Sequence, residues 1–138
     1  MKKSLVIIII AILACVPALR AEKKGDLLGA YTKVAKALSK DDLAAAKKAA
    51  AAIVKQDKDS SMAKSAGAIS EAKSLDEARK DFKALSEIAV KLAKGKKGYY
   101  VLHCPMVKGG GGDWLQTDKK VANPYFGASM LECGGVKE

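Results

Sequence analysis

The stretch Ser74–Gly95, SLDEARKDFKALSEIAVKLAKG, predicts a long amphipathic helix and decides the fold class. Ser74 and Glu77 have the spacing of a capping box, in which their side chains satisfy amide groups of the first helical turn. Apolar residues then recur at steps of three and four, which places them on one face of a helix. They are Leu75, Ala78, Phe82, Leu85, Ala89 and Leu92. Such a face must pack against other elements, so we expect a helical domain.

The chain before this stretch carries the helical period three more times. A first helix ends near Ser39, and its apolar stripe consists of Leu27, Tyr31, Val34 and Leu38. Asp41 and Asp42 begin a second helix that ends near Lys58, and the polar residues 59–61 supply capping side chains for a third. Because the connections are short, we expect a mainly α fold, an antiparallel up-down bundle of about four helices.

The chain is thus expected to have three parts. A signal peptide covers residues 1–21, the helical bundle covers residues 22–98, and a C-terminal lobe covers residues 99–138. The lobe is expected to be irregular, to contain a short strand beginning near Tyr99, and to pack as part of the same domain as the helices.

The N-terminal residues have the layout of a secretory signal peptide. Two lysines precede an apolar run from Leu5 to Leu13, which is too short for a transmembrane helix. We expect cleavage after Ala21, with Ala18 as an alternative, and no transmembrane segment in the mature chain. Lipid anchoring through Cys15 is a further alternative, because this cysteine has the position of a lipobox without its preferred residues. The predicted location is the periplasm.

The net charge of +10 could suggest binding to nucleic acid. However, acidic residues gather at predicted helix starts and lysines at predicted helix ends, as the helix macrodipole favours. The charge is therefore interpreted as a solvated face, and no nucleic-acid partner is expected. No enzyme activity is expected either, since the chain has one histidine, His103, and its position next to Cys104 suits it poorly as a general base.

Two clusters in the C-terminal lobe carry the sulfur chemistry: His103-Cys104-Pro105-Met106 and Met130-Leu131-Glu132-Cys133. Residues two apart in an extended segment, or three apart on a helical turn, share a face, so each cluster can present two sulfurs together. Thiolates and thioethers favour soft ions such as Cu(I) and Ag(I). The predicted ligands are Cys104, Met106, Met130 and Cys133, with His103 ranked below them, and the predicted wall of the site is Trp114, Tyr125 and Phe126.

A disulfide between Cys104 and Cys133 is the alternative. Two cysteines in an oxidising compartment usually pair, and closing a loop of about thirty residues stabilises a protein by about 3 to 4 kcal/mol. The chain would then be a disulfide-stapled helical interaction module of the cell envelope without a metal, and the methionines would pack against aromatic rings. Both states can also coexist, with metal held only after reduction.

Four segments of the lobe together resemble the C-terminal signature of a bacterial family, domain of unknown function 3347. The segments are Tyr100–Met106, Trp114–Gln116, Asn123–Gly127 and Met130–Gly134. The resemblance extends to the helices, through Tyr31, Ala37-Leu38, Asp41-Asp42 and Ala78–Ser86. The glycine run 109–112 departs from many members of the family, which are less glycine-rich there.

Domains of this family occur as small exported proteins and as extensions of periplasmic adaptor subunits of copper and silver efflux systems. The resemblance therefore implies a helical domain associated with heavy metals. Together with the sulfur clusters, it predicts a periplasmic Cu(I) or Ag(I) binding protein that sequesters the ion or delivers it to a component of a metal-efflux system.

Overall fold

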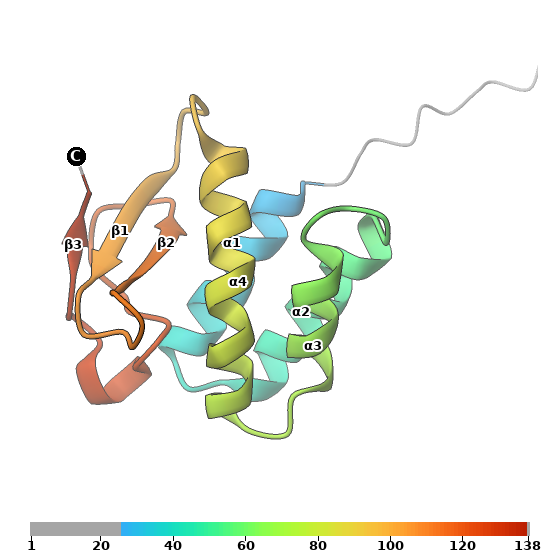
Figure 1. Ribbon diagram of the computed structural model, residues 1–138, viewed down its shortest axis with the longest axis horizontal. Helices are drawn as coiled ribbons and strands as arrows, with labels where there is room; N and C mark the ends of the chain where they lie inside the picture. Colours follow the sequence, from blue (N-terminus) through green and yellow to red (C-terminus); the bar gives the residue numbers. More distant parts are fainter. Residues whose placement is uncertain (1–25, 138) are drawn as a thin grey trace, which may run out of the picture.

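The computed structural model describes residues 26–137, so the predicted signal peptide, its cleavage sites and Cys15 lie outside the described residues. Four helices come first: α1 (Leu27–Ser39), α2 (Leu43–Gln56), α3 (Ala63–Glu71) and α4 (Leu75–Ala93). Strands β1 (Tyr100–Cys104), β2 (Gly112–Gln116) and β3 (Gly135–Val136) follow, with a short 3-10 helix, η1 (Gly127–Met130), before β3. The expected mainly helical fold with four helices is confirmed (Figure 1).

Side-chain caps explain where most of the helices begin. The carboxylates of Asp26 and Asp42 accept hydrogen bonds from the first turns of α1 and α2, and the hydroxyl of Ser74 does so for α4. The expected caps from residues 59–61 were wrong for α3. Met62 occupies that cap position without a side-chain hydrogen bond, because Ser60 instead donates to the Asp57 carbonyl oxygen at 2.8 Å.

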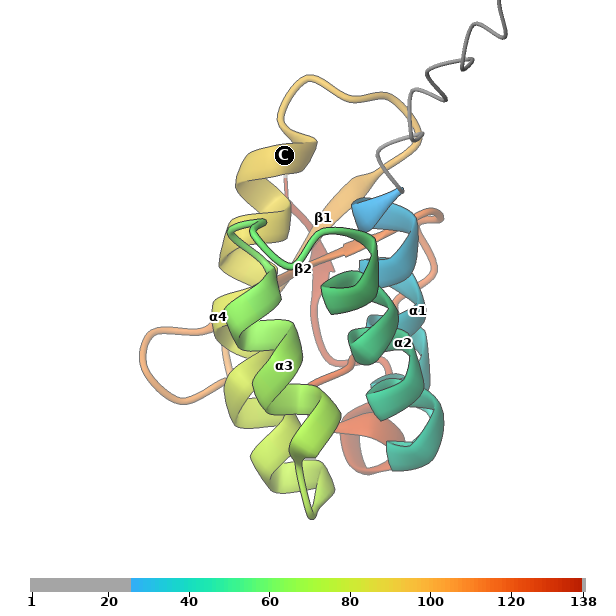
Figure 2. The same ribbon diagram turned by 90° about the vertical axis from the view of Figure 1, so that its right-hand side faces the viewer.

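The elements form layers, which the two perpendicular views show clearly (Figure 1, Figure 2). Helices α2 and α3 lie on one side, α1 and α4 lie in the middle, and the small sheet lies on the far side of α1 and α4. Each helix packs against the next one in the chain, and β2 packs on α4 and α1. A regular up-down bundle stays a prediction. None of the helices within residues 26–137 combines the length and the apolar character that crossing a bilayer requires.

A row of buried aromatic rings joins the helices to the sheet. Tyr31 of α1 stacks on Phe82 of α4, with ring centroids 5.5 Å apart. Tyr125 then contacts Phe82 and the Trp114 ring of β2 edge-on, at centroid distances of 5.4 and 6.1 Å. Since each aromatic pair contributes about 0.5 to 1.5 kcal/mol beyond its buried area, this row fixes the lobe onto the middle helices.

Two tyrosine hydroxyls from this row cover the outer edge of β2, which is an edge strand in the antiparallel order β2-β1-β3. Tyr31 accepts a hydrogen bond from the Leu115 amide at 3.3 Å, and Tyr125 donates to the Asp113 carbonyl oxygen at 2.7 Å. Burial raises the pKa of both hydroxyls above the ordinary tyrosine value. They stay protonated, and they satisfy two backbone groups that an edge strand would otherwise leave open to pairing.

The lobe is more regular than predicted, because three strands replace the single expected one. The strand beginning at Tyr100 ends at Cys104, where Pro105 lacks the amide hydrogen that would continue the pairing. Residues 105–111 then turn the chain into β2. Gly109, Gly110 and Gly111 take positive φ values of 84°, 91° and 86°, which only glycine adopts at little cost.

Candidate functional site

The fold brings Cys104 and Cys133 together. Cys104 is the last residue of β1, Cys133 lies two residues before β3, and their Sγ atoms are 2.9 Å apart although the residues are 29 positions apart in sequence. Both are free thiols. Cys104 is fully buried, whereas Cys133 is partly exposed. A reactant from solvent therefore meets the Cys133 sulfur first.

The alternation of side chains along β1 points Cys104 into the core. Leu102 and Cys104 are buried, whereas His103 between them lies on the other face and is partly exposed. The His103 Nδ1 atom is 2.6 Å from Asp113 Oδ1, and Lys137 Nζ is 2.8 Å from Asp113 Oδ2. His103, ranked lowest among the predicted ligands, thus belongs to a separate polar cluster on the outer face of the sheet.

The neighbouring groups of this cluster lower the pKa of the Asp113 carboxyl. Partial burial alone would raise the pKa of its carboxyl, but hydrogen bonds from Lys137 and His103 hold that pKa below its ordinary value. Asp113 therefore stays ionised at neutral pH and orients the imidazole.

Asn123 holds the loop that carries Cys133. Its side chain is fully buried, donates to the Cys133 carbonyl oxygen at 2.7 Å and accepts from the Tyr125 amide at 2.8 Å. Its backbone amide donates to the Leu131 carbonyl oxygen at 2.8 Å, and its own carbonyl accepts from the Gly127 amide at 3.0 Å. Four hydrogen bonds from one residue thus close the loop around η1, and the site depends on them.

The two predicted methionine ligands lie on the segments that lead away from the thiol pair. The Cys133 amide donates to the Met130 carbonyl oxygen at 3.0 Å, so the expected turn between these residues is confirmed. Met106 differs from expectation because it lies in the turn after β1, where its side chain is 60% exposed. The expected extended segment from Cys104 to Met106 was therefore wrong.

The three predicted wall residues differ in burial. Trp114 and Tyr125 belong to the same buried core as Cys104, and Phe126 and Cys133 pack against that core from its edge. Gly134 lets the chain pass close to the indole, since a Cβ atom there would lie 2.9 Å from the Trp114 ring. That these rings form the wall of the sulfur site stays a prediction.

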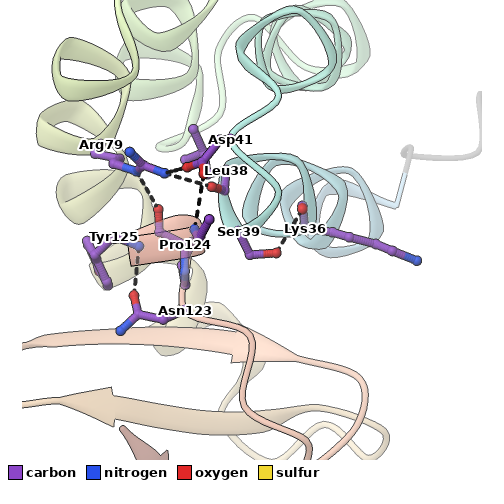
Figure 3. Close-up of polar contacts among 9 residues, drawn as sticks. Lys36, Leu38, Ser39, Asp41, Arg79, Asn123, Pro124 and Tyr125 are labelled. Carbon is purple, nitrogen blue, oxygen red and sulfur yellow. Dashed lines mark hydrogen bonds and ion pairs between the residues drawn. The ribbon is translucent and has the colours of Figure 1, made fainter. Parts of the chain in front are cut away.

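Sequence reasoning missed a second group of contacts, which fixes η1 to the helices (Figure 3). Arg79 of α4 donates to the Pro124 carbonyl oxygen at 3.0 Å and to the Leu38 carbonyl oxygen at 2.9 Å, and forms an ion pair with Asp41. Asp41 also accepts from the Ala128 amide at 3.1 Å. The hydrogen bonds from the Arg79 side chain and the Ala128 amide lower the pKa of the Asp41 carboxyl.

One signal for this group was present in the sequence. Arg79 is the only arginine among residues 26–137, in a chain that otherwise uses lysine. A guanidinium presents several donors in a fixed plane and can hold two carbonyls and a carboxylate at once, which an ammonium group does poorly. The sequence does not indicate the partners of Arg79, because each of them lies outside α4.

The thiol pair offers a soft and sparse set of donors. Within residues 26–137, no three side chains of His, Cys, Asp or Glu converge on a common metal position, as a structural zinc site would require. The hydrogen bond with Cys104 and, secondarily, burial raise the pKa of the Cys133 thiol. An ion bound here must therefore displace protons from the thiols, and affinity should rise with pH.

Comparisons of the chain with protein-family models, with curated proteins and with solved structures found no match. The resemblance to domain of unknown function 3347 stays a prediction.

Proposed function

We propose that the protein binds Cu(I) or Ag(I) through Cys104 and Cys133, to sequester the ion or to deliver it to a metal-efflux partner in the periplasm. The observation that supports this is the convergence of two thiols, one buried and one accessible, with 2.9 Å between their sulfurs. Thiolates prefer soft ions. Residues 26–137 bring no third histidine, cysteine or carboxylate to the pair, which suits ions that accept few ligands.

Binding requires a small opening of the pair. With metal–thiolate bonds of about 2.3 Å, two sulfurs on opposite sides of one ion lie about 4.6 Å apart. This separation exceeds the present 2.9 Å between the two sulfurs. Cys133 is the sulfur that would move, because Cys104 is held in β1 while Cys133 precedes Gly134 on a loop. Met130 is one turn before Cys133, and Met106 lies on an exposed turn two residues after Cys104. Both methionines are proposed to complete the ligand set.

A disulfide-stapled interaction module is the second candidate, and the same sulfur separation favours it. Oxidation would close a loop of about thirty residues and stabilise the domain by about 3 to 4 kcal/mol in the chain-entropy model. In that case the thiols have a structural role and the methionines have none in binding.

A thiol count combined with a Cu(I) titration separates the two candidates. The mature domain is titrated before and after gentle reduction, against a competing chelator that sets the affinity scale. We expect one Cu(I) per reduced chain, with binding abolished by Cys133→Ser and weakened by Met106→Leu and by Met130→Leu. Met62→Leu is the matched control, because Met62 is fully buried among the helices and the swap nearly conserves volume.

The result that contradicts the proposal is equally clear. If the reduced domain fails to hold Cu(I) against the chelator, or if the three methionine variants behave alike, the sulfurs of the lobe do not form the site. A purified protein without free thiols and without copper affinity after reduction would support the stapled module.

The remaining predictions belong to this proposal. Export by an N-terminal signal peptide, periplasmic location, membership of the domain of unknown function 3347 family and an up-down order of the helices are all proposed with it. The intact mass of the exported protein distinguishes cleavage after Ala21 from cleavage after Ala18.

A further inference from the structure

A hollow lies between α1 and the segment that follows β2, away from the thiol pair. Its volume is about 360 Å³. Thr32, Lys33 and Lys36 line it from α1, and Lys40 lines it from the position just after that helix. Thr117 and Asp118 line it from the opposite segment. The proposed metal site uses none of these residues.

Three of the lining residues form a row of positive charge. Lys33 and Lys36 lie three apart on one face of α1, Lys40 follows four positions later as the C-cap residue, and all three are exposed. None of their ammonium groups forms an ion pair with a carboxylate within residues 26–137. Figure 3 shows the Lys36 side chain extending away from α1.

The bottom of the hollow is apolar. Ala35 and Leu115 are buried, and Ala122, partly buried, also lines it. The Ser39 hydroxyl, another lining group, donates to the Lys36 carbonyl oxygen at 2.9 Å. The hollow therefore combines buried apolar side chains with a rim that carries three lysines and one carboxylate, that of Asp118. The excess of positive charge favours a ligand that has both apolar and anionic groups.

We propose that this hollow binds an extended acidic segment of another protein, in which carboxylates alternate with apolar side chains. The seven residue steps from Lys33 to Lys40 span about 10 Å at the rise of a helix. Residues two apart in an extended chain are separated by about 6.7 Å, so two or three alternate carboxylates match the row while the intervening side chains face the bottom. The proposal is independent of the metal site.

The experiment uses the mature protein and a synthetic peptide, Glu-Val-Glu-Val-Glu-Val-Glu, followed by fluorescence anisotropy and by backbone amide NMR shifts. Comparison probes are the peptide with glutamine in place of glutamate, inorganic phosphate, and vesicles containing phosphatidylglycerol. The protein variants are K33Q/K36Q/K40Q and a matched control, K55Q/K64Q/K91Q, which removes the same charge from exposed positions on α2, α3 and α4.

We expect the acidic peptide to bind, with shifts confined to residues 32–40 and 115–122. An exposed ion pair raises affinity by a factor of about two to five, and K33Q/K36Q/K40Q removes three lysines that could form such pairs. This variant should therefore weaken peptide binding by about tenfold or more. The control variant and Cys133→Ser should bind within about twofold of the unchanged protein.

Three results would overturn the proposal. Equal losses in the two triple variants would mean a response to net charge alone. Displacement of the peptide by millimolar phosphate would mean a small-anion site, and binding to the vesicles without binding to the peptide would mean a membrane-facing surface.

Discussion

Replacing Asn123 with alanine should loosen the loop that carries Cys133. The substitution leaves the buried Tyr125 amide and the Cys133 carbonyl oxygen without their partners, which now lie at 2.8 and 2.7 Å. An unsatisfied buried group costs about 1 to 3 kcal/mol, and the Cys133 carbonyl can regain water because that residue is partly exposed. We expect a loss of about 2 to 4 kcal/mol in the free energy of unfolding, a large part of a typical domain's stability.

Urea unfolding followed by Trp114 fluorescence measures this loss, since Trp114 is the only tryptophan and is fully buried beside the loop. Ser39→Ala is the control, because Ser39 is also buried but makes only a local bond within its own helix. Under native conditions, the thiols of Asn123→Ala should react faster with a thiol reagent than those of the control. A loss below about 1 kcal/mol, together with unchanged thiol reactivity, would refute the role assigned to Asn123.

Three further predictions test the contacts around η1 and, through Asp113, the polar cluster on the outer face of the sheet. Arg79→Lys keeps the charge but loses the planar fork, so it should lower the free energy of unfolding by about 2 to 3 kcal/mol in urea titrations. The pKa values of Asp41 and Asp113 are lowered on folding, so their contribution is present above the ordinary value of 3.8 and is lost as the pH falls below it. The melting temperature should thus be constant near neutral pH and fall on acidification. The fall should be smaller for Asp41→Asn. A Cβ on Gly127, where φ is +56°, would overlap the Asp41 carboxylate and the Arg79 guanidinium, so Gly127→Ala should lower the free energy of unfolding by at least about 2 kcal/mol. Gly67 in α3 has open space around it, so Gly67→Ala should raise the free energy of unfolding by up to about 1 kcal/mol.

The helices were predictable because their signals are local. The apolar stripe of α4 and the hydrogen bond from the Glu77 amide to the Ser74 hydroxyl involve residues within a few positions of one another. The prediction failed at the start of α3, where Ser60 bonds to Asp57 instead of capping the helix. Short polar side chains have several partners within reach, and the sequence does not rank them.

The candidate site was predictable in its residue types but not in its geometry. The side-chain alternation of a strand correctly separated His103 from Cys104. Pro105 and the glycine turn took Met106 out of the extended segment that had been expected. The second and third strands were missed because their pairing with β1 joins residues that have no local signal for each other.

By itself, the sequence determined the helical class, most of the helix ends and the soft character of the candidate donors. Periodicity, capping and side-chain chemistry act over four residues or fewer, so they can be read along the chain. Only the tertiary structure decided that Cys104 meets Cys133 across 29 positions, that Asn123 closes the loop, and that Arg79 joins α4 to Asp41 and Pro124. These contacts form where separate elements pack together, and their partners are set by the burial of the common core rather than by any neighbour in sequence.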